Sequence, residues 1–253
     1  MNASRTIRLD LAYDGTDFRG WARQPDPSIR TVEGELARLL ELTLGAPVRL
    51  FVAGRTDAGV HAKGQVASFV MSSPRRPEQI QALVNGELAP EVVITRAAAV
   101  PASFHARFSA TAREYRYVIR TGEVADPFMG RFEWHRPGAL HVPSMRAAGR
   151  LLLGEHDFTS FCRHPGAGKR TVRRLERVTV ARHGDHVVLG FRANAFLHQM
   201  VRSLVGTLVR VGEGKLDPAE VGRILAARSR AGAGQLAPAR GLTLERVVYG
   251  GAS

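Results

Sequence analysis

The order in which strand-like and helix-like stretches follow one another constrains this chain more than any other feature of its sequence. Residues 6–13 alternate apolar and polar side chains, which is typical of a half-buried strand. After a long stretch rich in Gly, Pro and Asp, Thr31 can cap a helix that carries one apolar stripe and that Gly45 ends. We then expect strands at 48–53, 65–70 and 92–97, and a second helix that opens at Pro77. This order, β-α-β-β-α-β, predicts a ferredoxin-like split unit.

The second half of the chain repeats this order with one helix added. We expect strands at 112–120, 175–182, 186–193 and 242–249, and helices at 142–153, 196–211 and 218–227. His183, Gly184 and Asp185 separate two of these strands and are typical of a tight hairpin. The sequence therefore predicts an α+β protein with a mainly antiparallel sheet and two ferredoxin-like domains, residues 1–104 and residues 105–253.

Charge is the most informative bulk property of the chain. Its 36 basic residues against 23 acidic residues give a formal net charge of +13, and only three of the basic residues are lysine. Such an excess favours a polyanionic partner, because each Lys or Arg placed on a phosphate releases condensed counterions. Arginine also binds phosphates bidentately and stacks on bases, which suits RNA. A proteome biased towards arginine would explain the choice of arginine over lysine, but not the net excess.

Several classes of protein are disfavoured by what the sequence lacks. The single cysteine, Cys162, cannot form an intramolecular disulfide or a Cys-rich zinc site. No apolar run approaches the ~20 residues of a membrane span, and residues 1–15 lack the apolar core of a signal peptide. The nine histidines show no H-E-x-x-H spacing, and no paired carboxylates mark a metal site. We therefore expect a cytoplasmic protein without a metal centre or a membrane partner.

The densest group of candidate functional residues is GRTDAGVHA at residues 54–62. It lies between two expected strands, and its glycines allow backbone angles that other residues avoid. A carboxylate on such a turn, here that of Asp57, can project into a cleft with its geometry fixed from both sides. The alternative is an Asx turn, in which Asp57 accepts hydrogen bonds from the backbone of its own loop. Judged on these residues alone, the Asx turn is the more common arrangement.

GRTDAGVHA resembles the signature of the bacterial tRNA pseudouridine synthase A family, and further blocks resemble this family in the same order. They are YDGTDFRGW at 13–21, ARFSATAREYRY at 106–117, DFTSF at 157–161, FLHQMVRSLVGTLVRVGEG at 196–214 and APARGLTLERVVY at 237–249. Several long motifs in one order are far more specific than any single match. The resemblance implies two ferredoxin-like halves that share a central cleft, which we expect to be basic here. It also implies a homodimer, with a tRNA spanning the pair.

The resemblance implies that the chain isomerises uridine to pseudouridine in the anticodon arm of tRNA, at positions 38, 39 and 40. The reaction breaks the bond between N1 and C1′, rotates the base, rejoins it through C5 and removes the C5 proton. It consumes no water, electrons or ATP, so no cofactor is expected. Asp57 matches the family's nucleophile. An aspartate suits this role because it is ordinarily ionised at neutral pH, whereas a serine would need a separate base.

Three further residues match positions of the family's active site. Tyr115 matches the aromatic residue, whose face can stack on the extruded uracil and whose hydroxyl can help take the C5 proton. Arg202 matches the arginine that pairs with the aspartate, and Arg55 matches a residue that enters the RNA and occupies the space of the flipped base. Taken alone, Tyr115 would be a core tyrosine and Arg202 a solvated surface charge. His61 supports the loop in this interpretation and is not assigned as an acid or a ligand.

Two departures from the family pattern concern contacts with RNA rather than catalysis. Ala22 stands where a Gln commonly follows the Trp of the first block. Glu33 stands where a Gln is frequent at the start of the first helix. Both positions lie in the first half of the chain, so the details of RNA binding there are expected to differ.

Two other classes of protein share part of this pattern. A non-catalytic RNA-binding protein on paired ferredoxin-like domains usually presents exposed aromatics in an RNP-type run, and no such run occurs in the sequence. A metal-dependent nuclease or phosphotransferase needs clustered carboxylates, which the sequence also lacks. Both alternatives predict that RNA binding and RNA chemistry do not depend on Asp57.

Overall fold

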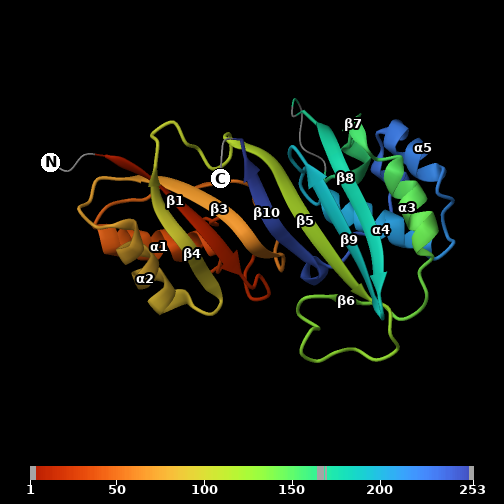
Figure 1. Cartoon of the computed structure of the whole chain (residues 1–253), viewed down its shortest axis with the longest axis horizontal. Coiled ribbons are helices and arrows are strands. Elements are labelled where there is room, and N and C mark those ends of the chain that lie inside the picture. The colour runs from red at the N-terminus through yellow and green to blue at the C-terminus, as the bar shows by residue number, and fades with distance from the viewer. Residues whose placement is uncertain (1–3, 164–167, 169, 251–253) are drawn as a thin grey trace. The chain divides into compact units, whose positions relative to one another are not determined.

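The computed structural model of the chain describes residues 4–163, 168 and 170–250. It shows a mixed α+β protein whose strands pair almost entirely in antiparallel fashion, as the sequence predicts (Figure 1). The contacts within the chain divide it into two compact units. Unit 1 comprises the residues up to Thr111 and those from Leu244 on, and unit 2 comprises Ala112–Thr243.

Unit 1 is a sheet with two helices that pack side by side. Its elements are β1 (Arg5–Tyr13), α1 (Val32–Leu44), β2 (Phe51–Val52), β3 (His61–Met71), α2 (Pro77–Leu88), β4 (Val92–Val100) and β10 (Leu242–Tyr249). The sheet order is β4-β1-β3, and both β2 and β10 neighbour β3. From β1 to β4 the order of elements along the chain is the predicted one. Alternate side chains of β1, among them Ile7, Leu9 and Leu11, are fully buried and form part of the core.

The two helices of unit 1 begin and end at local signals. The hydroxyl of Thr31 accepts a hydrogen bond from the N–H of Gly34 at 3.2 Å and so caps the start of α1. Gly45 ends the helix in the left-handed region, with a φ of +66°. Helix α2 starts at Pro77, whose fixed φ suits the first helical position.

Unit 2 contributes its own strands, which pair mainly in antiparallel fashion, and its own helices. Its elements are β5 (Ala110–Arg120), β6 (Trp134–His135), α3 (Val142–Arg150), β7 (Gly154–Asp157), β8 (Val172–His183), β9 (His186–Ala193), α4 (Met200–Gly212) and α5 (Glu220–Ala227). The sheet order is β5-β9-β8-β7, and the short β6 pairs with β5 in parallel. Helix α3 packs against β8 and α4. In the part of the chain that the structure describes, no helix is long and apolar enough to cross a membrane.

Some element boundaries differ from the sequence predictions. The strand expected at 48–53 is reduced to the two residues of β2, which follow a stretch containing Pro47, a residue without an N–H to donate. The helix expected from residue 196 starts only at Met200, because Gln199 has a φ of +63° that no α-helix accommodates. The four-residue strand β7 was not expected at all, since its sequence, GEHD, has no apolar alternation.

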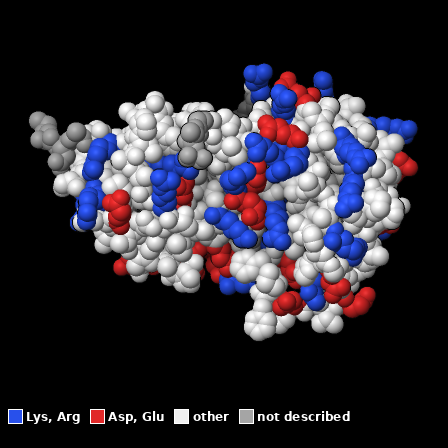
Figure 2. All heavy atoms as spheres, viewed as in Figure 1, with Lys and Arg blue, Asp and Glu red and all other residues white. Residues whose placement is uncertain are grey.

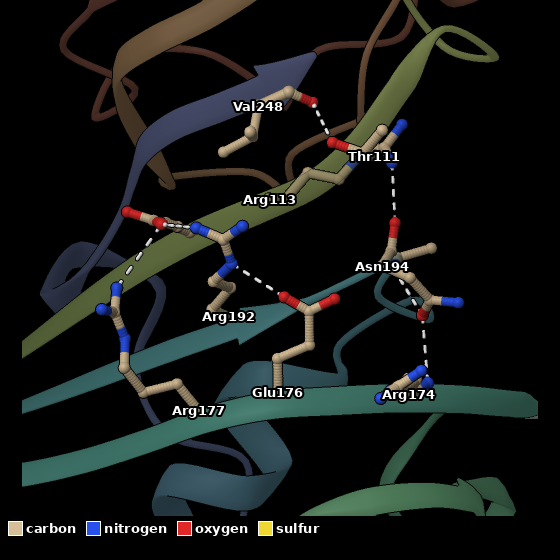
Figure 3. Close-up of polar contacts among 10 residues, drawn as sticks. Thr111, Arg113, Arg174, Glu176, Arg177, Arg192, Asn194 and Val248 are labelled. Atoms are coloured by element: carbon tan, nitrogen blue, oxygen red, sulfur yellow. Dashed lines mark hydrogen bonds and ion pairs between the residues drawn. The ribbon is translucent and has the colours of Figure 1, made fainter. Parts of the chain in front are cut away.

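One face of the unit 2 sheet carries interleaved charges, which Figure 2 shows in blue and red over β5, β9 and β8. Arg192 of β9 donates from Nη1 to Glu114 Oε1 and from Nε to Glu176 Oε2, both at 2.7 Å (Figure 3). Arg177 Nη2 lies 3.4 Å from Glu114 Oε1. Exposed ion pairs of this kind contribute little stability, about 0–1 kcal/mol each. Their consequence is that the charges of Arg177 and Arg192 are partly neutralised by neighbouring carboxylates.

Candidate active site

Asp57 lies on the turn between β2 and β3, residues 54–60, which we name the Asp57 turn. The turn is closed by Val60, whose N–H donates to the main-chain carbonyl of Asp57 at 3.1 Å. At its start, Gln65 Nε2 donates to the carbonyl of Gly54 at 2.8 Å. The Asp57 residue itself is half-buried. A turn held at both ends restricts the positions that its carboxylate can take.

Residues 13–21 run from the last residue of β1 into the loop after it and hold the Asp57 turn from outside, and we name them the brace. The N–H of Trp21 donates to the carbonyl of Thr56 at 3.0 Å, and the N–H of Gly59 donates to the carbonyl of Phe18 at 3.3 Å. Trp21 and Phe18 are 0% and 2% exposed, so the brace is itself anchored in the core. The main chain of the turn is therefore bonded to a buried part of unit 1.

Two glycines let the brace approach the turn closely. Gly20 has a φ of +94°, and a Cβ added to it would lie 2.9 Å from the carbonyl oxygen of Thr56 and 3.2 Å from the carbonyl carbon of Asp57. A Cβ added to Gly15 would lie 2.0 Å from the carbonyl oxygen of Val60. Any other residue at these positions would push the backbone of the turn away. The close approach of the brace to the turn therefore explains why glycine stands at these two positions of the YDGTDFRGW block, which the sequence alone did not show.

A buried polar group beneath the turn was missed by the sequence analysis. Gln65 Nε2 lies 3.3 Å from the hydroxyl of Tyr13, which lies 2.8 Å from Thr56 Oγ1. Because the amide of Gln65 donates to the tyrosine oxygen, the tyrosine hydroxyl can donate to Thr56. Burial raises the pKa of Tyr13 to about 12, although these hydrogen bonds oppose the increase. The hydroxyl is therefore neutral at pH 7 and serves as a fixed link between β1, the turn and β3.

His61 also holds this region together. It is the first residue of β3 and is buried. Its Nδ1 lies 3.0 Å from the N–H of Gly15, which donates to it, and 3.1 Å from a carboxylate oxygen of Asp14. The ring thus connects β3 to the start of the loop that carries the brace, in line with the supporting role expected from the sequence.

Tyr115 lies on β5 of unit 2 and is 8% exposed. Its ring meets the ring of Phe196 edge to face, with centroids 5.0 Å apart and an interplanar angle of 83°. Two residues further along the strand, the hydroxyl of Tyr117 donates to the carbonyl of Pro238 at 2.8 Å. Burial raises the pKa of Tyr117, and the positive charges of Arg202 and Arg240 oppose this increase.

Arg202 lies on α4, also in unit 2, and is half-buried rather than solvated. Its Nε donates to the carbonyl of Ala237 at 2.8 Å, and the N–H of Ala237 donates back to the carbonyl of Arg202 at 3.2 Å. The bond from Nε thus anchors the guanidinium group to the main chain at Ala237. Arg202 is therefore not the solvated surface arginine that an isolated arginine on a helix usually is.

The predicted site residues fall into two groups. Arg55, which is exposed, and Asp57 share one turn of unit 1, whereas Tyr115 and Arg202 belong to unit 2. Among the described residues, no group of His, Cys, Asp and Glu is placed to hold a metal ion. A single carboxylate on a braced turn, within an α+β fold, suits an enzyme that works with one aimed oxyanion.

Comparison with known proteins identifies which such enzyme family this is. The tRNA pseudouridine synthase family matches residues 11–109 and 148–250, and the chain belongs to this family. Members of the family are isomerases that convert uridine to pseudouridine, which confirms the family and the class of enzyme predicted from the motifs.

Individual relatives are similar over almost their whole length. The chain is 46% identical to tRNA pseudouridine synthase A of Brevibacillus brevis, across 97% of this chain and 100% of that protein. It is 44% identical to the protein of the same name from Halalkalibacterium halodurans, across 94% of this chain and 90% of that protein. It is 41% identical to the protein of the same name from Moorella thermoacetica, across 96% of this chain and 99% of that protein.

Proposed function

We propose that this enzyme converts the uridines at positions 38, 39 and 40 of the tRNA anticodon arm to pseudouridine, with Asp57 as the nucleophile. The observation that carries the proposal is the position of Asp57 on a turn that the brace and Gln65 hold by main-chain and buried side-chain bonds. A reaction that depends on the position of one carboxylate benefits when the turn that carries it is held in this way.

The chemistry requires an oxyanion and two proton movements. The bond between N1 and C1′ breaks, the uracil turns, and a bond between C5 and C1′ forms. The proton on C5 then leaves, and N1 ends with a proton, so no electrons or other atoms are exchanged. Asp57 supplies the negative charge that attacks the nucleoside or stabilises the oxocarbenium-like sugar.

The other site residues take roles that their positions support. Tyr115 stacks on the extruded uracil, and its hydroxyl assists removal of the C5 proton. Arg202 supplies a positive charge that keeps the catalytic carboxylate ionised, and the bond from its Nε to the carbonyl of Ala237 holds its guanidinium to the main chain. Arg55 occupies an exposed position on the Asp57 turn, from which it enters the space that the flipped base leaves.

Action on three neighbouring positions implies that the enzyme reads the shape of the RNA backbone rather than its base sequence. The net charge of +13 supports this mode, because cationic side chains bind phosphates at any sequence. The target base leaves its stack at a cost of a few kcal/mol, which stacking and pocket contacts offset.

The test of this function is tritium release from tRNA labelled at C5 of uridine, followed by mapping of the modified positions. We expect Asp57→Ala to bind tRNA and to release no tritium. Asp26→Asn is the matched control, because Asp26 is an exposed carboxylate that bonds only within its own loop, to Ser28. Release by the Asp57 variant at the rate of the control would refute the site, and modification only outside positions 38–40 would refute the substrate position.

We also propose that the enzyme is a cytoplasmic homodimer. The segment 121–133 exposes several large apolar side chains, which a second copy would cover. They are Val124, Phe128, Met129 and Phe132, with exposed fractions of 74%, 86%, 44% and 36%. We expect Phe128→Ser to lower the mass measured by sedimentation equilibrium, whereas Leu42→Ser, at an exposed apolar site on α1, leaves it unchanged. A wild-type chain that sediments as a monomer would refute the dimer.

A further inference from the structure

Unit 1 carries a set of packed aromatic rings and guanidinium groups that the proposed reaction does not use. The ring of Phe51 of β2 packs against that of His105, and the ring of His105 packs against that of Phe108, each pair with centroids 4.5 Å apart and with tilted planes, at 47° and 37°. The guanidinium carbon of Arg49 lies 5.0 Å from the centroid of Phe51, and that of Arg107 lies 5.4 Å from the centroid of Phe108. We name these five residues the aromatic row.

The aromatic row is built on a fixed segment. The N–H groups of Arg107 and Phe108 both donate to His105 Nδ1, at 3.1 and 3.3 Å, which sets the orientation of the imidazole ring. Between His105 and Arg107 in the chain, the N–H of Ala106 donates to the hydroxyl of Ser68 on β3 at 3.1 Å. The rings therefore keep their places relative to the unit 1 sheet.

Phe108 is, like Phe128, a largely exposed phenylalanine. It is 76% exposed, whereas Phe18, Phe69 and Phe191 are 2% exposed or less. A phenylalanine held rigidly in solvent gives up the favourable burial that stabilises the others. Because the segment that carries it is pinned to the sheet, its exposure is part of the folded structure rather than a consequence of a loose chain.

We propose that the aromatic row binds unpaired bases of the RNA substrate, with Phe108 as the stacking surface and Arg49 and Arg107 as contacts for the adjoining phosphates. This inference rests on the proposed function, in that tRNA is the substrate. Aromatic faces flanked by arginine are the usual surface for unpaired bases. Both arginines are exposed, and the whole chain is strongly basic, so a polyanion matches the row better than an apolar protein surface does.

The position of the row supports a contact with the same RNA that reaches Asp57. Phe51 precedes Asp57 by six residues in the chain. Six residues span at most about 22 Å even when fully extended, so the two lie within that distance of each other. An arm of a tRNA is long enough to contact both. The row would therefore hold a neighbouring part of the substrate while one uridine is extruded.

The first test compares variants of Phe108 in a tRNA binding assay at fixed salt. Loss of a stacking ring costs about 1–3 kcal/mol per base, so we expect Phe108→Ala to raise the Kd for tRNA about 5- to 150-fold. Phe108→Trp should restore binding, whereas Phe108→Leu, which is apolar but has no π face, should not. Leu42→Ala is the control for removal of an exposed apolar side chain, since Leu42 is 71% exposed on α1.

A second variant tests the phosphate contacts separately. Replacing Arg49 and Arg107 together by Gln removes two cations and leaves the rings in place. For an unpaired strand, the slope of log K against log[salt] should become less steep by about 0.7 for each phosphate that is no longer neutralised. An unchanged slope would mean that these arginines do not face phosphates.

The possible results separate this inference from the proposed function. A Kd within twofold of wild type for Phe108→Ala, or wild-type binding by Phe108→Leu, would overturn the aromatic row as a stacking site. A change in sedimenting mass for Phe108→Ala with no change in Kd would also overturn it and would assign the ring to a contact between copies. If the wild-type enzyme releases tritium but Phe108→Ala binds tRNA with an unchanged Kd, only the aromatic row is refuted. If the wild-type enzyme releases no tritium, the proposed function is refuted.

Discussion

Replacement of Gly20 by alanine tests whether the brace positions Asp57. Gly20 has a φ of +94°, which alanine rarely adopts. The new Cβ would also lie 2.9 Å from the carbonyl oxygen of Thr56 and 3.1 Å from the nitrogen of Ala58, on either side of Asp57. All of these neighbours are main-chain atoms, so the contact can be relieved only if the turn and the brace separate.

The magnitude follows from two contributions. Holding an L-residue in the left-handed region costs about 1–2 kcal/mol. Inserting a methyl group into a closely packed place costs about 1–3 kcal/mol more. Together they lower the free energy of unfolding by roughly 2–5 kcal/mol, which corresponds to a fall in Tm of about 4–20 °C for a chain of this size. If the turn moves by about 1 Å, kcat for tritium release should fall about 100-fold.

Gly45→Ala is the matched control for this experiment. Gly45 also has a positive φ, +66°, but nothing lies within 4 Å of the Cβ that alanine would add. It should therefore show only the backbone contribution of about 1–2 kcal/mol and retain wild-type tritium release. The assay compares kcat at a temperature at which both variants are folded by circular dichroism. Wild-type kcat in Gly20→Ala, or an equal loss in Gly45→Ala, would refute the role of the brace.

Two further predictions concern pH and salt. Burial raises the pKa of Tyr13 to about 12, above its ordinary value near 10, so its contribution to stability is complete below pH 10 and is lost as the pH rises from 10 to 12. The difference in urea midpoint between wild type and Tyr13→Phe should shrink over that range, and a constant difference would contradict the buried hydroxyl. Binding of tRNA should weaken steeply with salt: if roughly five phosphates are neutralised, log K against log[salt] should have a slope near −3.5 to −4.5. A flat dependence, measured by filter binding, would mean that the basic surface serves another purpose.

The parts of the fold that the sequence predicted are those that local signals determine. Helix α1 was expected from Thr31 to Gly45 because a hydroxyl cap and a left-handed glycine act within one turn of the chain. The predicted start of α4 was wrong by several residues, because Gln199 has a left-handed φ and a glutamine gives no sign of this in the sequence. Strand β7 was missed for a related reason: it pairs with β8 at residues about twenty positions away, and its own side chains are polar.

The candidate site shows the same division between local and distant information. Asp57 and Tyr115 could be named from motifs, and their positions on a turn and on an alternating strand follow from local patterns. The hydrogen bond between Tyr13 and Thr56 joins residues 43 positions apart, and neither residue type indicates that the other is its partner. The sequence could therefore supply the reactive group, but not the contacts that hold it.

The nature of the proposed reaction explains why those contacts matter. An isomerisation that consumes no water or cofactor leaves the protein few ways to accelerate it other than charge and position. An aspartate needs no separate base, so its catalytic value depends on where its oxygens point. Side chains can adjust to small displacements, but main-chain atoms packed against glycine cannot, and the brace meets the Asp57 turn through main-chain atoms at Gly15 and Gly20. The rate of isomerisation should therefore respond more sharply to a methyl group added at these glycines than to the loss of any one surface arginine outside the proposed site.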